Sequence, residues 1–124
     1  MGRIVVADDD ADIRDLVVMK LQSSGHDVTA VGDGVAAVEA SRAGVPDLIV
    51  LDVMMPGMSG LEACRAIRSE PGLASVPVIL LTARAQASDI EEGVAAGATD
   101  YVVKPFSPRE LAFRVATLLG GSPV

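Results

Sequence analysis

The chain has 124 residues, a formal net charge of −7 and 50% hydrophobic residues. This length suits one domain with a single buried core, and the composition excludes a disordered chain. The acidic balance argues against direct binding of nucleic acid by this domain. We find no apolar run that could span a bilayer and no signal peptide, so we expect a cytoplasmic protein that binds no membrane.

Apolar runs of strand length alternate five times with stretches of helical spacing. The strand-like runs lie near residues 4–6, 28–31, 48–51, 76–82 and 99–105. The second is the weakest and suits the edge of a sheet. Alternating strands and helices predict a parallel sheet with helices on both faces. Three of the runs are apolar throughout, as expected for strands that are buried on both sides.

Polar residues mark the predicted beginnings of the helices. Asp10 and Asp33 are predicted N-caps. Three pairs have the spacing of a capping box, namely Ser59 with Glu62, Ser88 with Glu91, and Ser107 with Glu110. The first helix carries apolar residues at Ile13, Leu16, Val17 and Leu21, and the second at Val35 and Val38. His26, the only histidine, is predicted to be a surface turn residue without a special role.

Chemically active side chains follow the strands of the predicted sheet. They are Asp8, Asp9 and Asp10 after the first strand, Asp52 at the end of the third, Thr82 at the end of the fourth and Lys104 at the end of the fifth. Ligands bind outside the carboxyl ends of parallel strands, so these groups are expected to converge. Clustered carboxylates attract Mg²⁺. A metal, a lysine and a hydroxyl neutralise phosphoryl charge, and a carboxylate can act as the nucleophile.

Four segments resemble one known family in their order and spacing. The segments IVVADDD, PDLIVLDVMMPGMSG, VPVILLTA and GATDYVVKPFSPREL resemble the response-regulator receiver domains of two-component signalling, the CheY-like family, over about residues 3–119. The resemblance implies an α/β fold with a five-stranded parallel sheet of order 2-1-3-4-5 and helices on both faces. Residues 1–120 would form the receiver domain, and residues 121–124 a tail or the start of a linker.

The resemblance also implies a phosphoacceptor site. The residue matching Asp52 accepts a phosphoryl group from a histidine kinase or phosphotransfer protein. Mg²⁺ (or Mn²⁺) is implied at Asp8, Asp9 and Asp52 and at the backbone carbonyl of Met54. In the family the position of Asp9 ligates the metal directly, and that of Asp8 acts largely through bound water. The domain is then a phosphorylatable signalling domain and not a turnover enzyme.

Further positions match residues that hold the phosphoryl group or respond to it. Lys104, Thr82 and the Ala83 backbone N–H match the groups that contact the phosphoryl oxygens. Tyr101 matches an aromatic switch that turns inward when the threonine moves. The bond from Lys104 to Pro105 is cis in the family.

Two further positions match those that tune hydrolysis of the aspartyl phosphate. They are Met54 and Arg84, two residues beyond Asp52 and Thr82. An apolar Met54 should not orient water, which predicts moderately slow loss of the phosphoryl group.

The output surface is expected on the fourth helix, the fifth strand and the last helix. Its partners would be a C-terminal effector domain, a downstream protein or a second copy in a phosphorylation-linked homodimer. Asp100, Glu110 and Arg114 match charged dimer positions of regulators that carry winged-helix domains. Ile90 stands where those regulators have a basic residue, and Thr99 where they often have Asp, which puts an ion-paired dimer in doubt.

Three alternatives differ in the residues that they require. A haloacid-dehalogenase-type phosphohydrolase would use Asp8 and Asp10 as its Asp-x-Asp pair, but the pair lacks the usual Gly-Thr after it and leaves Asp52 without a role. A dinucleotide-binding fold needs glycines in the first strand–helix turn, where this chain has none. A degenerate receiver that only binds partners would lack phosphorylation residues, whereas all of them are present. Asp10 is more consistent with a helix cap than with a metal ligand.

Overall fold

The computed structural model describes residues 2–83 and 86–120, so Arg84 and the 121–124 tail lie outside the described residues. Its strands are β1 (Arg3–Ala7), β2 (Asp27–Val31), β3 (Leu48–Asp52), β4 (Val78–Thr82) and β5 (Asp100–Val103). Its helices are α1 (Ala11–Ser23), α2 (Gly34–Ala43), α3 (Gly60–Ser69), α4 (Ala87–Ala95) and α5 (Pro108–Leu118). No helix in these ranges is both long and apolar enough to cross a bilayer.

The five strands form one parallel sheet with the order β2-β1-β3-β4-β5, which confirms the predicted fold class. The weak second strand lies at an edge, as predicted, and none of its five residues is fully buried. By contrast, every residue of the central strand β3 is buried. Because the strands are parallel, their carboxyl ends lie along one edge of the sheet. Most of the predicted site residues lie at or just after these ends, whereas Tyr101 lies near the start of β5.

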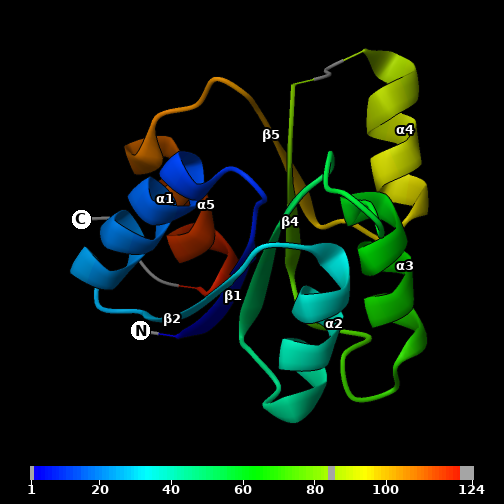
Figure 1. Cartoon of the computed structure of the whole chain (residues 1–124), viewed down its shortest axis with the longest axis horizontal. Coiled ribbons are helices and arrows are strands. Elements are labelled where there is room, and N and C mark those ends of the chain that lie inside the picture. The colour runs from blue at the N-terminus through cyan, green and yellow to red at the C-terminus, as the bar shows by residue number, and fades with distance from the viewer. Residues whose placement is uncertain (1, 84–85, 121–124) are drawn as a thin grey trace.

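Helices cover both faces of the sheet (Figure 1). One core lies under α1 and α5, where Ile4 and Val6 of β1 pack against Val17, Leu21, Leu111 and Val115. The other lies under α2 and α3, where Val5 and Ala7 pack with Ala37, Val38, Cys64 and Ile67. Alternate residues of a strand point to opposite faces, so each buried strand supplies side chains to both cores.

Most of the predicted helix starts are confirmed. Asp10 is the N-cap of α1 and accepts hydrogen bonds from the backbone N–H groups of Asp12 (2.9 Å) and Ile13 (3.2 Å). Asp33 caps α2 in the same way. Ser59 and Glu62 form the predicted reciprocal capping box of α3. At the start of α5 only half of the predicted box is present, since Ser107 accepts from the Glu110 N–H without a reciprocal bond from the Glu110 side chain.

Two expectations about individual residues, Ser88 and His26, were wrong. The capping box at Ser88 does not form, because α4 begins at Ala87 with Gln86 as its N-cap and Ser88 lies inside the first turn. Leu16 and Val35 lie on α1 and α2 as predicted, and their side chains are 54% and 48% exposed. His26 is half-buried, and its Nδ1 accepts a hydrogen bond from the Gly2 N–H (3.1 Å).

Candidate functional site

Three carboxylates meet at the carboxyl edge of the sheet. Asp8 and Asp9 follow β1, and Asp52 is the last residue of the neighbouring strand β3. One oxygen atom from each lies within 4.8 Å of the others. Asp8 and Asp52 are buried, with exposed fractions of 0% and 3%, whereas Asp9 is exposed. The predicted acidic cluster therefore forms, and one of its three members faces solvent.

Lys104 reaches into this cluster from the residue after β5. Its Nζ lies 3.1 Å from Asp52 Oδ1 and 3.4 Å from Asp8 Oδ2. Its backbone N–H donates to the carbonyl of Thr82 (2.7 Å), which continues the pairing of β5 with β4. The peptide bond from Lys104 to Pro105 is cis, as the resemblance implied. Strand pairing thus fixes the backbone from which the lysine side chain extends.

The cluster holds more buried negative charge than Lys104 can neutralise. Burial, and after it the charge of Asp8, raises the pKa of Asp52 to about 6, although the hydrogen bond from Lys104 acts in the opposite direction. Burial lowers the pKa of Lys104, but its hydrogen bond and attraction to Asp52 outweigh that effect, so the pKa is raised overall. Three carboxylates around one ammonium supply the hard oxygen donors that suit Mg²⁺, so these residues fit that ion.

The backbone around Asp8 is held by hydrogen bonds within the β1–α1 turn. Asp8 Oδ1 accepts from the Asp10 N–H (3.0 Å), and Arg14 Nη1 donates to the Asp8 carbonyl (2.9 Å). The sequence analysis did not identify Arg14 as part of the site. Its only sequence signal is its position one turn after Asp10, the N-cap of α1, which places it near the end of β1.

Gly60, the first residue of α3, is the second feature that the sequence analysis missed. Its N–H donates to the Val53 carbonyl (3.0 Å), and a Cβ at this position would overlap the carbonyl oxygen of Asp52. The N-terminus of α3 therefore lies directly against the backbone of Asp52. Only glycine permits this approach without a shift of the backbone.

The remaining predicted residues lie on, or directly after, β3, β4 and β5. Thr82 is buried at the end of β4, whereas Ala83 and Met54 are exposed in the segments that follow β4 and β3. Tyr101 lies earlier on β5, opposite Leu80 of β4, and is half-buried in the core under α2 and α3. The structure brings Asp8, Asp9, Asp52 and Lys104 together but keeps Tyr101 out of this charged group.

Asp10 does not belong to the acidic cluster. Its carboxylate caps α1, which is the structural role predicted for it. The haloacid-dehalogenase-type alternative needs Asp8 and Asp10 to act together on one substrate. The capping contacts of Asp10 argue against that pairing.

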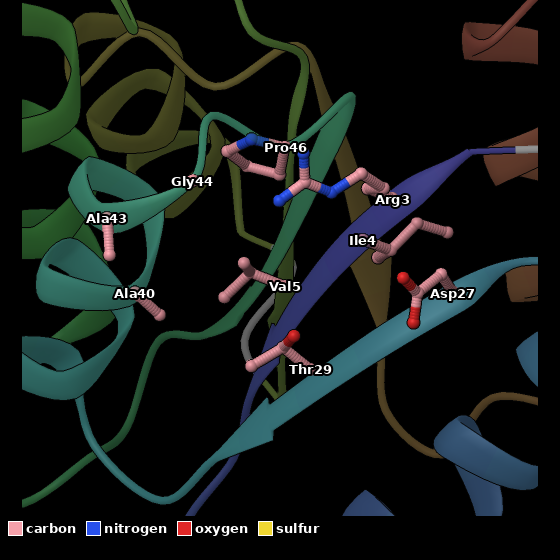
Figure 2. A pocket seen from close by; sticks show the side chains of 9 residues that line it. All are labelled: Arg3, Ile4, Val5, Asp27, Thr29, Ala40, Ala43, Gly44 and Pro46. Carbon is pink, nitrogen blue, oxygen red and sulfur yellow. The ribbon is translucent and has the colours of Figure 1, made fainter.

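A separate hollow lies at the amino ends of β1 and β2, at the opposite edge of the sheet (Figure 2). Its walls are formed by Arg3, Ile4, Val5, Asp27, Thr29, Ala40, Ala43, Gly44 and Pro46. The guanidinium of Arg3 extends over it toward Gly44 (Figure 2). None of these residues belongs to the acidic cluster, so the hollow is not part of the candidate site.

Known proteins share both the sequence and the fold. The chain matches the family described as the response regulator receiver domain over residues 4–116. It is 43% identical to the DNA-binding response regulator MtrA of Mycobacterium tuberculosis over 117 residues, which are 94% of this chain and 50% of that protein. The chain thus spans about half the length of the curated relatives that it matches.

Two solved structures extend the comparison. The Vibrio cholerae chemotaxis protein CheY4 superposes with a TM-score of 0.91 at 33% identity, covering 95% of this chain and 98% of that one. The receiver domain of the sensor histidine kinase PA1611 from Pseudomonas aeruginosa superposes with a TM-score of 0.89 at 33% identity, covering 97% and 98%. That structure holds a magnesium ion in its active-site cleft. The present chain belongs to the response regulator receiver domains of two-component signalling.

Proposed function

We propose that Asp52 is the phosphoacceptor of this receiver domain. An oxygen of its carboxylate attacks phosphorus in line on a phosphohistidine of a sensor kinase or phosphotransfer protein, or on a small acyl phosphate. A P–O bond to Asp52 forms, and the bond from phosphorus to the donor breaks. The observation that carries the proposal is the buried Asp52 carboxylate, 3.1 Å from Lys104 and grouped with Asp8 and Asp9.

Asp8, Asp9, Asp52 and the Met54 carbonyl would hold Mg²⁺, or Mn²⁺ in its place. When bound, the ion neutralises charge on the transferring phosphoryl group. Lys104 already contacts Asp52 and stays close enough to contact a phosphoryl oxygen. The Thr82 hydroxyl and the Ala83 N–H would supply further donors, because Thr82 is the last residue of β4, the strand next to β3, and Ala83 follows it. Apolar Met54 orients no water, so we expect moderately slow hydrolysis, and a half-life of seconds would contradict this role.

The phosphoryl group would change the output surface through Thr82 and Tyr101. Drawing the Thr82 hydroxyl toward the site vacates space beside β5, into which Tyr101 turns. A modification shifts such an equilibrium only by its differential interaction with the two states. The covalent phosphoryl group supplies that difference, and the α4–β5–α5 surface changes. The domain acts as a signalling switch that promotes its own phosphorylation and dephosphorylation and does not turn over a substrate.

The partners follow from this role. This domain would act in the cytoplasm, where a sensor histidine kinase or phosphotransfer protein would donate the phosphoryl group. The output would pass to a C-terminal effector domain, as in the DNA-binding relatives, or to a downstream protein, while this acidic domain itself binds neither nucleic acid nor a membrane.

A phosphorylation-linked homodimer would use the α4–β5–α5 surface. Arg114 forms two 3.0 Å contacts with Asp100 and one of 3.7 Å with Glu110 inside the same chain. Exposed Ile90 and Phe113 lie on the helices of this surface. The dimer would therefore bury apolar side chains where related dimers use an additional ion pair. Light scattering with and without beryllofluoride tests this, and an unchanged mass contradicts it.

Intact-mass measurement after incubation with Mg²⁺ and acetyl phosphate tests the phosphoacceptor. We expect the wild type to gain the mass of one phosphoryl group and Asp52→Asn to gain none. Asp27→Asn, which changes an exposed carboxylate at the opposite edge of the sheet, should gain it as the wild type does. An adduct that survives Asp52→Asn overturns the assignment. Sustained release of phosphate from a generic ester would favour the phosphohydrolase alternative.

A further inference from the structure

Arg68 on α3 uses its whole guanidinium group to hold backbone at the amino ends of β4 and β5. Its Nε donates to the Gly97 carbonyl (2.8 Å) and its Nη1 to the Val76 carbonyl (2.7 Å). Nη1 also lies 3.4 Å from the Leu73 carbonyl oxygen, and Nη2 lies 3.4 Å from Thr99 Oγ1. These acceptors belong to two separate connections, α3–β4 and α4–β5. One side chain therefore ties both connections to α3.

The C-terminal end of α4 fits closely against this arginine. Gly97 follows the helix with φ +97°, and a Cβ there would lie 2.6 Å from Arg68 Cγ, so both the backbone conformation and the contact require glycine. Cys64, one turn earlier on α3, has its Sγ 3.3 Å from the Ala96 carbonyl oxygen. Two side chains of α3 thus contact consecutive carbonyls, which fixes this end of α4.

Thr99 extends the same attachment to the sheet. Its N–H donates to the Val78 carbonyl (2.8 Å), and its Oγ1 accepts from the Val78 N–H (3.1 Å) while facing Arg68. Val78 is the first residue of β4, whose last residue is Thr82. The fixed end of α4 and the predicted phosphoryl contact therefore lie at opposite ends of one strand.

Among the residues that the structure describes, fewer hydrogen bonds hold the N-terminal end of α4 than its C-terminal end. Its N-cap, Gln86, forms no side-chain capping hydrogen bond, and Gly93 is the only buried residue of Ala87–Ala95. Gly93 packs on Leu80 and the ring of Tyr101, where an added Cβ would lie 3.3 Å from both side chains. A nine-residue helix rises about 13 Å, so a small rotation about one end moves the other end by several ångströms.

We infer that Arg68 is a positioning residue that fixes the C-terminal end of α4 as a pivot. When the Thr82 hydroxyl is drawn toward the phosphorylated site, the N-terminal end of α4, which is nearer to Thr82 along the chain, moves. Ile90 and Val94 rotate with the helix. This inference rests on the proposed function, since it requires that phosphorylation of Asp52 changes the surroundings of Thr82.

Amide hydrogen exchange along α4, with Mg²⁺ and with or without beryllofluoride, tests the pivot. In the wild type we expect rates in residues 87–90 to change about tenfold and rates in residues 93–97 to change less than about twofold. In Arg68→Gln both segments should change, and residues 93–97 should exchange about tenfold faster before beryllofluoride is added. Arg65→Gln, which alters an exposed arginine on the same helix, should keep the wild-type pattern.

Separate measurement of the acetyl phosphate adduct distinguishes failure of the proposed phosphoacceptor role from failure of the pivot. Arg68→Gln should form the adduct, since its contacts are with the opposite edge of the sheet. If the wild type forms no adduct, the proposed function fails. If the wild type forms it but exchange changes evenly along α4, or Arg68→Gln behaves as the wild type does, the pivot is wrong. Should Arg68→Gln not fold, Thr99→Val removes one acceptor and should loosen residues 96–99 alone; no loosening there overturns the inference.

Discussion

The ammonium group of Lys104 lies between two buried carboxylates, 3.1 Å from Asp52 Oδ1 and 3.4 Å from Asp8 Oδ2. One ammonium group therefore neutralises the charge of two buried carboxylates only in part. Burial of Asp52, and after it the neighbouring charge of Asp8, raises the pKa of Asp52 to about 6 despite this contact with Lys104. A divalent cation bound at this cluster would offset its excess negative charge and so stabilise the folded protein.

Replacing Lys104 should destabilise the metal-free protein. Lys104→Met leaves Asp52 and Asp8 without their cation, and we expect the free energy of unfolding at pH 7.5 to fall by about 1–3 kcal/mol. The loss stays below the value for a fully buried pair because the lysine side chain is 19% exposed. Urea denaturation measures it, with Lys20→Met as the matched control, which should change stability by less than about 0.5 kcal/mol. Equal stability of the two variants would refute this account.

Asp52 should make the protein less stable as the pH rises. Its pKa is about 6 in the folded protein and 3.8 ordinarily, so between these values the folded state binds more protons than the unfolded state. The free energy of unfolding therefore falls with rising pH across this window. Asp52→Asn removes the carboxyl group that ionises at a cost in the folded protein. The variant should therefore be more stable than the wild type by about 1–3 kcal/mol at pH 7.5, with the difference shrinking toward pH 4. Urea denaturation in EDTA from pH 4 to 8 measures the difference, and a pH-independent difference would contradict it.

The charged cluster could be predicted from the sequence because it depends only on the order of strands and helices and on the residues at the strand ends. Apolar runs alternating with helical spacing imply a parallel sheet, and a parallel sheet brings its carboxyl ends to one edge. The convergence of Asp8, Asp52 and Lys104 could therefore be predicted from the sequence alone. Asp10 could be assigned to a cap for a similar reason, since capping depends on neighbours within one turn.

Other contacts could not be predicted, because their acceptors are backbone atoms. Arg14 and Arg68 donate to carbonyl oxygens, which every residue carries, so no sequence pattern marks the acceptor. The close approach of Gly60 to Asp52 depends on the angle at which α3 leaves the sheet. The wrong capping box at Ser88 has a related cause, since the motif is informative only when the first residue of the helix is already known.

Position 60 should tolerate no side chain, because Gly60 packs directly against the backbone of Asp52. Gly60→Ala places a Cβ on the Asp52 carbonyl oxygen, so either β3 or α3 must shift, and we expect a loss of about 3 kcal/mol. Gly72→Ala is the matched control, because a Cβ there meets nothing within 4 Å. It should be neutral or stabilising by up to about 1 kcal/mol. Thermal unfolding compares the two, and similar losses would show that the contact with Asp52 is not the cause.

Substitution should show that the neighbouring residues Asp9 and Asp10 have different roles, Asp9 as a metal ligand and Asp10 as a helix cap. Asp9 is exposed, belongs to the carboxylate cluster and forms no cap, so Asp9→Ala should leave stability nearly unchanged and abolish Mg²⁺-dependent phosphorylation. Asp10 accepts two backbone hydrogen bonds at the start of α1, so Asp10→Ala should cost about 0.5–2 kcal/mol and retain phosphorylation. Urea denaturation and the acetyl phosphate adduct are measured on both variants. The assignment fails if Asp9→Ala still forms the adduct, or if Asp10→Ala loses it while remaining folded.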